Sequence, residues 1–118
     1  MLNLKWWKCG NDGHWCSFKN LDLDSVTESG VYIIWYEGSP GRVVYVGQGD
    51  PISERISAHR SNDDILAYQD RGTLRVTGAS VAVAERDGVE RYLANKLQPL
   101  VGSAHPDTDP IEVNLPWK

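Results

Sequence analysis

Hydrophobic and polar positions first alternate in a regular pattern at residue 30 of this 118-residue chain. The segments 30–35 and 43–47 are rich in valine, isoleucine and aromatic residues, as expected of β-strands. Between them lies 37–41, whose two glycines and one proline favour a hairpin loop over a crossover. The pattern therefore predicts an antiparallel hairpin.

The register of this hairpin decides where its tyrosines point. If Tyr36 pairs with Gly41, the same register places Tyr32 opposite Tyr45, and both phenols then project from one face. A shift of one residue would send the two phenols to opposite faces. The other face carries the predicted core side chains, which are Val31, Ile33, Val44 and Val46.

A helix is predicted directly after the second strand. Asp50 is a suitable N-cap, and Pro51 suits the first helical position. Two isoleucines spaced by four form a buried edge of this helix, and Arg55 and His59 share the adjoining face. One helix thus presents a cation beside an imidazole.

The rest of the chain predicts a short helix, a strand and a longer helix. Polar residues at 61–64 form a turn and cap for the short helix. The strand that follows has a predicted bulge or break at 78–80, where the hydrophobic alternation changes phase. In 89–97 apolar residues recur every four positions, with Glu90 at the edge of the stripe. Glu90 also stands three residues after Asp87, a spacing typical of a capping box that only satisfies the helix start.

This order of elements predicts an α/β domain of the α+β type, with a small antiparallel three-stranded sheet flanked by helices. At 118 residues the chain has room for one such domain. We expect 1–29 to be an aromatic-rich N-terminal extension that packs on the domain and covers one side of the sheet. An irregular tail is expected at 103–118, in which 111–115 could add a short edge strand.

The ordered motifs resemble those of the GIY-YIG nuclease superfamily. They are Gly30-Val31-Tyr32, Tyr45-Val46-Gly47, Arg55 with His59, and Glu90 followed by Pro99. The resemblance covers about residues 30–102, and it implies that the first two motifs lie on adjacent antiparallel strands. In the family an asparagine usually stands three residues after the proline, where this chain has Gly102. Asn95 or Asn114 is a candidate substitute.

The resemblance implies a metal-dependent endonuclease that hydrolyses DNA, and less readily RNA. Such hydrolysis needs an activated water and stabilisation of charge on the phosphoryl and leaving oxygens. By analogy Glu90 would bind Mg²⁺ or Mn²⁺, and Arg55 would grip the phosphate. A tyrosine, Tyr32 before Tyr45, would orient or deprotonate the water. A phenol base needs a pKa below its ordinary value of ~10, whereas histidine titrates near neutrality, so His59 is the alternative base.

The net charge of −4 and the pI of about 5.2 exclude a protein that coats nucleic acid through bulk positive charge. A compact cationic patch is still available, from Arg42, Arg55, Arg60 and Arg71. We expect weak, salt-sensitive binding to DNA or RNA, with a protein partner adding affinity. The alternative function is a catalytically weak or inactive module that binds nucleic acid or protein on the same fold.

Two further features concern the location of the protein and its N-terminal residues. No segment approaches the ~20 apolar residues of a membrane span, and the start of the chain lacks the apolar core of a signal peptide, so a cytoplasmic location is expected. Cys9 and Cys16 flank His14 without a clear fourth ligand, which argues against zinc. A reducing compartment argues against a disulfide, and we predict free thiols. The N-terminal tryptophans are expected to pack and not to stack on bases.

Overall fold

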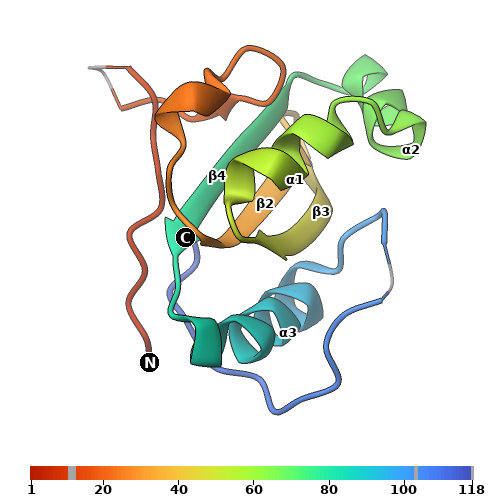
Figure 1. Cartoon of the computed structure of the whole chain (residues 1–118). Coiled ribbons are helices and arrows are strands. Elements are labelled where there is room, and N and C mark those ends of the chain that lie inside the picture. Colours follow the sequence, from red (N-terminus) through yellow and green to blue (C-terminus); the bar gives the residue numbers. More distant parts are fainter. Residues whose placement is uncertain (11–12, 103, 118) are drawn as a thin grey trace.

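The computed structural model describes residues 1–10, 13–102 and 104–117 (Figure 1). Its strands are β1 (Cys16–Ser17), β2 (Gly30–Tyr36), β3 (Arg42–Gly49) and β4 (Leu74–Ser80). Its α-helices are α1 (Ile52–His59), α2 (Asp63–Leu66) and α3 (Arg86–Leu97), with single 3₁₀ turns at Leu23–Ser25, Ala67–Asp70 and Val83–Glu85. The α+β class is confirmed, but the antiparallel sheet has four strands in the order β1-β4-β2-β3, and not three.

The additional strand comes from the N-terminal segment. Residues 16–17 pair with β4, and further upstream the Trp7 amide donates a hydrogen bond to the Gly78 carbonyl at 3.0 Å. The Thr77 hydroxyl donates to the Trp7 carbonyl at 2.8 Å. The N-terminal segment therefore runs along β4 and is held by backbone contacts that hydrophobic periodicity does not predict.

The predicted break at 78–80 is wrong. β4 pairs with β2 without interruption from Leu74 to Ser80. Gly78 has a packing role, because a Cβ atom there would lie 2.8 Å from the Trp7 indole. The missing side chain makes room for a ring from a distant part of the chain.

The hairpin of β2 and β3 forms with a register different from the predicted one. Tyr36 pairs with Arg42, which leaves 37–41 as the loop, and a β-bulge follows opposite the Ile34–Trp35 step. Each of these two features offsets the strands by one residue, so Tyr32 lies opposite Gly47 and not opposite Tyr45. Because the offsets sum to two, both tyrosines still share a face.

The bulge has one further consequence for the predicted core. Val44 packs in the same cluster as Tyr32, whereas Val31, Ile33 and Val46 pack in the cluster on the opposite face. Val44 was expected on that opposite face. The extra residue of the bulge therefore changes the side to which one of the four predicted core residues points.

The two faces of the sheet carry separate hydrophobic clusters. Ile52 and Ile56 of α1 pack with Tyr32 on one face, and Val89 and Leu93 of α3 pack on the other (Figure 1). The N-terminal tryptophans are divided between the faces: Trp7 packs on the α1 side, and Trp6 and Trp15 pack on the α3 side. The N-terminal extension was expected to cover one side of the sheet, but its tryptophans pack on both sides.

The C-terminal segment is irregular and lies against α3 and the first residues of the chain. A single parallel bridge joins Leu2 to Val113, in place of the edge strand suggested for 111–115. The Asn114 side chain bonds both the amide and the carbonyl of Leu4. Within the described residues no helix has the length and apolar character needed to cross a membrane.

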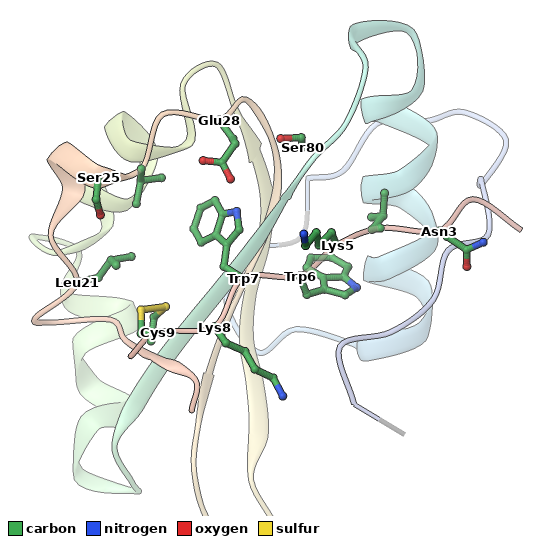
Figure 2. A pocket seen from close by; sticks show the side chains of 13 residues that line it. Asn3, Lys5, Trp6, Trp7, Lys8, Cys9, Leu21, Ser25, Glu28 and Ser80 are labelled. Carbon is green, nitrogen blue, oxygen red and sulfur yellow. A yellow bond between two sulfur atoms is a disulfide. The ribbon is translucent and has the colours of Figure 1, made fainter. Parts of the chain in front are cut away.

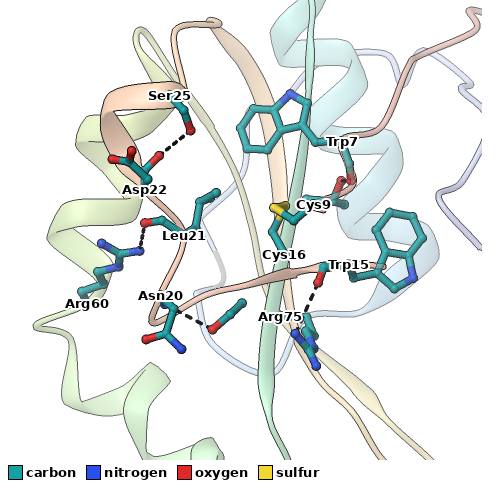
Figure 3. Close-up of a disulfide and its surroundings, with 12 residues drawn as sticks. Trp7, Cys9, Trp15, Cys16, Asn20, Leu21, Asp22, Ser25, Arg60 and Arg75 are labelled. Atoms are coloured by element: carbon teal, nitrogen blue, oxygen red, sulfur yellow. Dashed lines mark hydrogen bonds between the residues drawn. A yellow bond between two sulfur atoms is a disulfide. The ribbon is translucent and has the colours of Figure 1, made fainter. Parts of the chain in front are cut away.

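Cys9 and Cys16 form a disulfide, with Cα atoms 4.9 Å apart, so the prediction of free thiols is wrong (Figure 3). The prediction rested on the expected compartment, whereas the local chain geometry decides the pairing. An antiparallel bridge between Cys9 and His14 reverses the chain and brings the two cysteines together. Both then pack in the cluster on the α1 side.

We expect the double substitution Cys9→Ser/Cys16→Ser to lower the free energy of unfolding by about 2 kcal/mol, because opening a short loop restores chain entropy to the unfolded state. Urea unfolding of the parent and the variant, with and without dithiothreitol, measures this effect. Reductant should move the parent midpoint to that of the variant and leave the variant unchanged. A parent midpoint that ignores reductant would contradict the disulfide.

Candidate active site

Three of the predicted site residues form one compact group of rings. Tyr32 and Tyr45 are stacked, with ring centroids 6.1 Å apart and planes inclined by 12°. His59 lies against both, with its centroid 4.3 Å from that of Tyr45. The Tyr32 hydroxyl and His59 Nε2 are hydrogen-bonded at 2.7 Å. Side chains from β2, β3 and α1 thus pack together around the buried Tyr32–His59 hydrogen bond.

Two glycines of the second motif make this contact sterically possible. A Cβ atom on Gly47 would lie 2.6 Å from the Tyr32 oxygen, so a side chain there would displace the phenol. A Cβ atom on Gly49 would lie 2.8 Å from Arg55 Cγ and from Ile52 Cα. The bare backbone of β3 therefore lets Tyr32 lie over the strand and lets α1 begin directly beside it.

Helix α1 begins at Ile52, one residue after the predicted start at Pro51, and it lacks the predicted cap. Its N-cap is Pro51, and no side chain bonds the first amides. Asp50 instead accepts a hydrogen bond from the Ser29 hydroxyl at 2.6 Å and pairs with Arg86 at 3.3 Å. These two partners occupy the Asp50 carboxylate, so the prediction of Asp50 as the N-cap is wrong.

Burial and a nearby cation set the charge state of the Tyr32–His59 pair. Burial first, and the Arg55 charge second, lower the pKa of His59 from 6.5 to about 4. Burial, followed by the neighbouring Tyr45, raises the pKa of Tyr32 even though Arg55 opposes this shift. Near neutral pH Tyr32 therefore keeps its proton, and its hydroxyl donates a hydrogen bond to Nε2 of the uncharged His59.

Arg55 and Tyr45 form the accessible side of the group. The Arg55 side chain is exposed, and its pKa is raised chiefly by hydrogen bonding to Tyr32, so it stays a cation. Tyr45 is half-buried, whereas Tyr32 is fully buried. Tyr45 is thus the more exposed of the two phenols.

Glu90 is available for a role other than helix capping. Helix α3 begins at Arg86, so Glu90 lies beyond the first residues of the helix, and Asp87 bonds a side chain of β3 and not the helix start. The Glu90 side chain is 8% exposed. Gln48 Nε2 donates to Glu90 Oε1 at 3.0 Å, and His105 Nδ1 contacts Oε2 at 2.8 Å.

The structure places Glu90 and the ring group on opposite sides of one edge strand. Tyr32 lies over Gly47, and the next residue along β3, Gln48, bonds Glu90. Successive strand residues face opposite sides of a sheet. The two parts are still within electrostatic range, because Glu90 is among the charges that raise the pKa of Tyr32. The candidate site therefore spans both faces at the β3 edge.

Among the residues that the structure describes, neither proposed substitute for the family asparagine is hydrogen-bonded to a residue of this site. Asn114 is bonded to Leu4, and Asn95 is exposed on α3. Gly102 lies beside Tyr45 with φ of +80°, and a Cβ atom on it would be 2.9 Å from Tyr45 Cε2. Position 102 thus contacts the Tyr45 ring through its backbone, and a side chain there would collide with the ring.

The predicted cationic patch is smaller than expected. Arg60 donates to the carbonyls of Phe18 and Leu21 at 2.9 and 2.6 Å, and Figure 3 shows the second of these contacts. It therefore ties the N-terminal segment to the end of α1. Arg42 and Arg71 are exposed and remain available with Arg55.

A hollow of about 770 Å³ lies away from this site, between the N-terminal segment and the sheet. Trp7 and Glu28 stand on its wall, together with the disulfide (Figure 2). The Trp7 indole nitrogen is buried without a hydrogen-bond partner among the described residues. None of the five predicted site residues lines this hollow.

Two residues of the site were not anticipated from the sequence. Gln48 could have been noticed as a polar residue between two motif glycines on a strand. His105 carries no such signal, because it follows Glu90 by fifteen residues in an irregular segment. In the described part of the chain no group of three or more histidine, cysteine, aspartate or glutamate side chains is arranged to hold a metal ion.

Comparisons of the chain with protein-family models, with curated proteins and with solved structures found no match. A relationship to the GIY-YIG nucleases is therefore a proposal, and its support is the order of the motifs and the way in which their residues meet.

We expect Arg55→Gln to raise the pKa of His59 above its parent value of about 4 but not to 6.5, because burial, the larger cause, remains. Ring signals in an NMR titration measure this pKa. Arg42→Gln, which removes an exposed cation at the start of β3, is the matched control and should leave it unchanged.

The same shift predicts a pH dependence of stability. The pKa of His59 is lower in the folded state than in the unfolded state. The contribution of neutral His59 to the free energy of unfolding is therefore fully present above pH 6.5 and is lost as the pH falls toward 4. A parent His59 that titrates near 6.5 would contradict the burial of a neutral imidazole.

Proposed function

We propose that this protein is a metal-dependent endonuclease-like domain that hydrolyses phosphodiester bonds in DNA, and less readily in RNA. The observation that carries the proposal is the buried Tyr32–His59 hydrogen bond of 2.7 Å, stacked behind an accessible Tyr45 and Arg55. Ordinary strand tyrosines need no imidazole partner. A cation, two phenols and a neutral base gathered at one edge suit the chemistry of an anionic substrate.

Glu90 fits the role of anchor for a divalent cation. Its carboxylate is buried, and its hydrogen-bond partners are the Gln48 amide and the His105 ring, with no lysine or arginine partner among the described residues. Mg²⁺ commonly uses one or two carboxylates and completes its shell with waters and substrate phosphate. When bound, such a cation would relieve negative charge on the phosphate and on the leaving oxygen.

Arg55 and Tyr45 are the residues placed to contact the substrate. The guanidinium is charged and exposed, and its planar set of donors matches phosphate oxygens. Tyr45 is among the groups that raise the pKa of Arg55, so the two side chains lie near enough to approach a phosphate or its attacking water together. We assign binding of the scissile phosphate to Arg55 and orientation of the water to Tyr45.

Tyr32 and His59 form the supporting pair behind them. His59 is uncharged near neutral pH partly because of the Arg55 cation. An arriving phosphate compensates that cation, which raises the pKa of His59 and makes it a stronger base. As Tyr32 Oη takes up an incoming proton, its own proton passes to His59 Nε2 along their hydrogen bond, which leaves Tyr32 neutral and His59 cationic. Proton uptake is thereby coupled to the presence of substrate.

The second candidate function is a binding module that has lost efficient chemistry. The backbone contact at Gly102 favours it, because no side chain at that position reaches the site. The exposed Arg42, Arg55 and Arg71 would still attract a phosphate backbone weakly and in a salt-dependent manner.

We expect Arg55→Gln to slow cleavage by about a hundredfold or more, because it removes a preorganised donor to the phosphate. Glu90→Gln should abolish cleavage at the Mg²⁺ or Mn²⁺ concentrations that support cleavage by the parent. Nicking of supercoiled plasmid and cleavage of branched and single-stranded DNAs and RNAs provide the readout. The matched controls are Lys19→Gln and Glu54→Gln, which remove a charge of the same sign at exposed positions outside the proposed site and should retain parent activity.

Binding of these substrates by a folded parent without any cleavage, with and without metal, would favour the binding module. Parent-like cleavage by both Arg55→Gln and Glu90→Gln would show that the site is assigned to the wrong residues.

A further inference from the structure

His105 and Glu90 form a buried pair that the motifs do not account for. Their side chains are 9% and 8% exposed, and His105 Nδ1 lies 2.8 Å from Glu90 Oε2. The other ring nitrogen, Nε2, is buried without a hydrogen-bond partner among the described residues. A buried polar atom without a partner disfavours folding, so packing alone does not explain a histidine here.

The segment that carries His105 is fastened to α3 at two points, which lie before and after Glu90 on the helix. The Arg91 guanidinium donates to the Pro106 carbonyl at 2.9 Å, directly after His105. The Ile111 amide donates to the Gly88 carbonyl at 2.9 Å, and Ile111 packs where a side chain on Gly88 would lie. The imidazole is therefore held against Glu90 by contacts that involve neither residue of the pair.

Both oxygens of Glu90 are fixed as a result. Gln48, which also bonds Asp87, bonds Oε1 from β3, and His105 bonds Oε2 from the C-terminal segment. A carboxylate held at both oxygens keeps one rotamer. Each oxygen still has a lone pair free for a further ligand.

We propose that His105 is a positioning residue for the metal anchor. Its Nδ1 donates a hydrogen bond to Glu90 Oε2 and so keeps the carboxylate turned toward Gln48 on β3. Tyr32 lies against the same strand from the opposite face of the sheet. This role rests on the proposed function, because it concerns the cation that Glu90 would bind. Hydrogen bonds that orient a metal ligand typically contribute about 10- to 100-fold in metal affinity.

Two matched amide substitutions test which ring nitrogen matters. In His105→Asn the amide nitrogen takes about the position of Nδ1, whereas in His105→Gln it extends toward the position of Nε2. Mn²⁺ affinity of the full chain is measured by titration calorimetry for the parent, both variants and Glu90→Gln. We expect the Asn variant to stay within about threefold of the parent and the Gln variant to bind about tenfold more weakly.

Equal affinities of the parent, His105→Asn and His105→Gln would overturn the positioning role, and so would equal losses in both variants. In either case loss of binding in Glu90→Gln would leave the proposed function standing. A parent that binds Mn²⁺ no better than Glu90→Gln would overturn the proposed function and the positioning role together.

A measurement on the parent alone covers the case in which a variant does not fold. Nitrogen-15 signals of the His105 ring should show a protonated Nδ1 without metal and should move on addition of Mg²⁺, because the ring bonds the metal anchor. Ring signals that are unchanged by saturating Mg²⁺, while the Gln48 signals move, would overturn the positioning role.

Discussion

The bare backbone at Gly47 and Gly49 is the constraint on which the rest of the site depends. A side chain at either position would occupy space now filled by the Tyr32 hydroxyl or by the first turn of α1. Because both positions lack one, a phenol from β2 and a helix after β3 can approach the same edge strand. The Tyr32–His59 hydrogen bond, the stacked Tyr45 and the exposed Arg55 all follow from this approach.

Burial then determines what each group can do. Tyr32 and His59 are shielded from solvent, so the first holds its proton and the second stays uncharged. Arg55 and Tyr45 are reachable and carry the contacts to the substrate in the proposed function. The proposed division of roles follows from the burial of each side chain, which sequence reasoning could not supply when it placed Tyr32 before Tyr45.

Local patterns in the sequence predicted much of the fold. The hairpin, the helix with Arg55 and His59 on one face, and the helix carrying Glu90 were all predicted from periodicity. The hairpin register was predicted wrongly, yet the tyrosines share a face, because a longer loop and a bulge offset the strands by one residue each. The two offsets cancel with respect to the face on which each tyrosine lies, although they change its partner on the opposite strand.

Contacts between distant segments could not be predicted in this way. The fourth strand, the place of Trp7 over Gly78 and the binding of Asp50 by Ser29 and Arg86 all join residues that no local pattern connects. The disulfide was missed because an argument from compartment replaced one from chain geometry. His105 was missed because an irregular segment has no periodicity to place it beside Glu90.

The central claim is that Glu90 and the ring group form one site across the β3 edge. A Mg²⁺ titration followed by NMR tests it directly, with amide signals of Gln48 reporting one face and ring signals of Tyr32 and His59 reporting the other. We predict that both faces respond with one dissociation constant and that Glu90→Gln removes both responses. Signals of Tyr32 and His59 that stay fixed while Gln48 responds would contradict a single site.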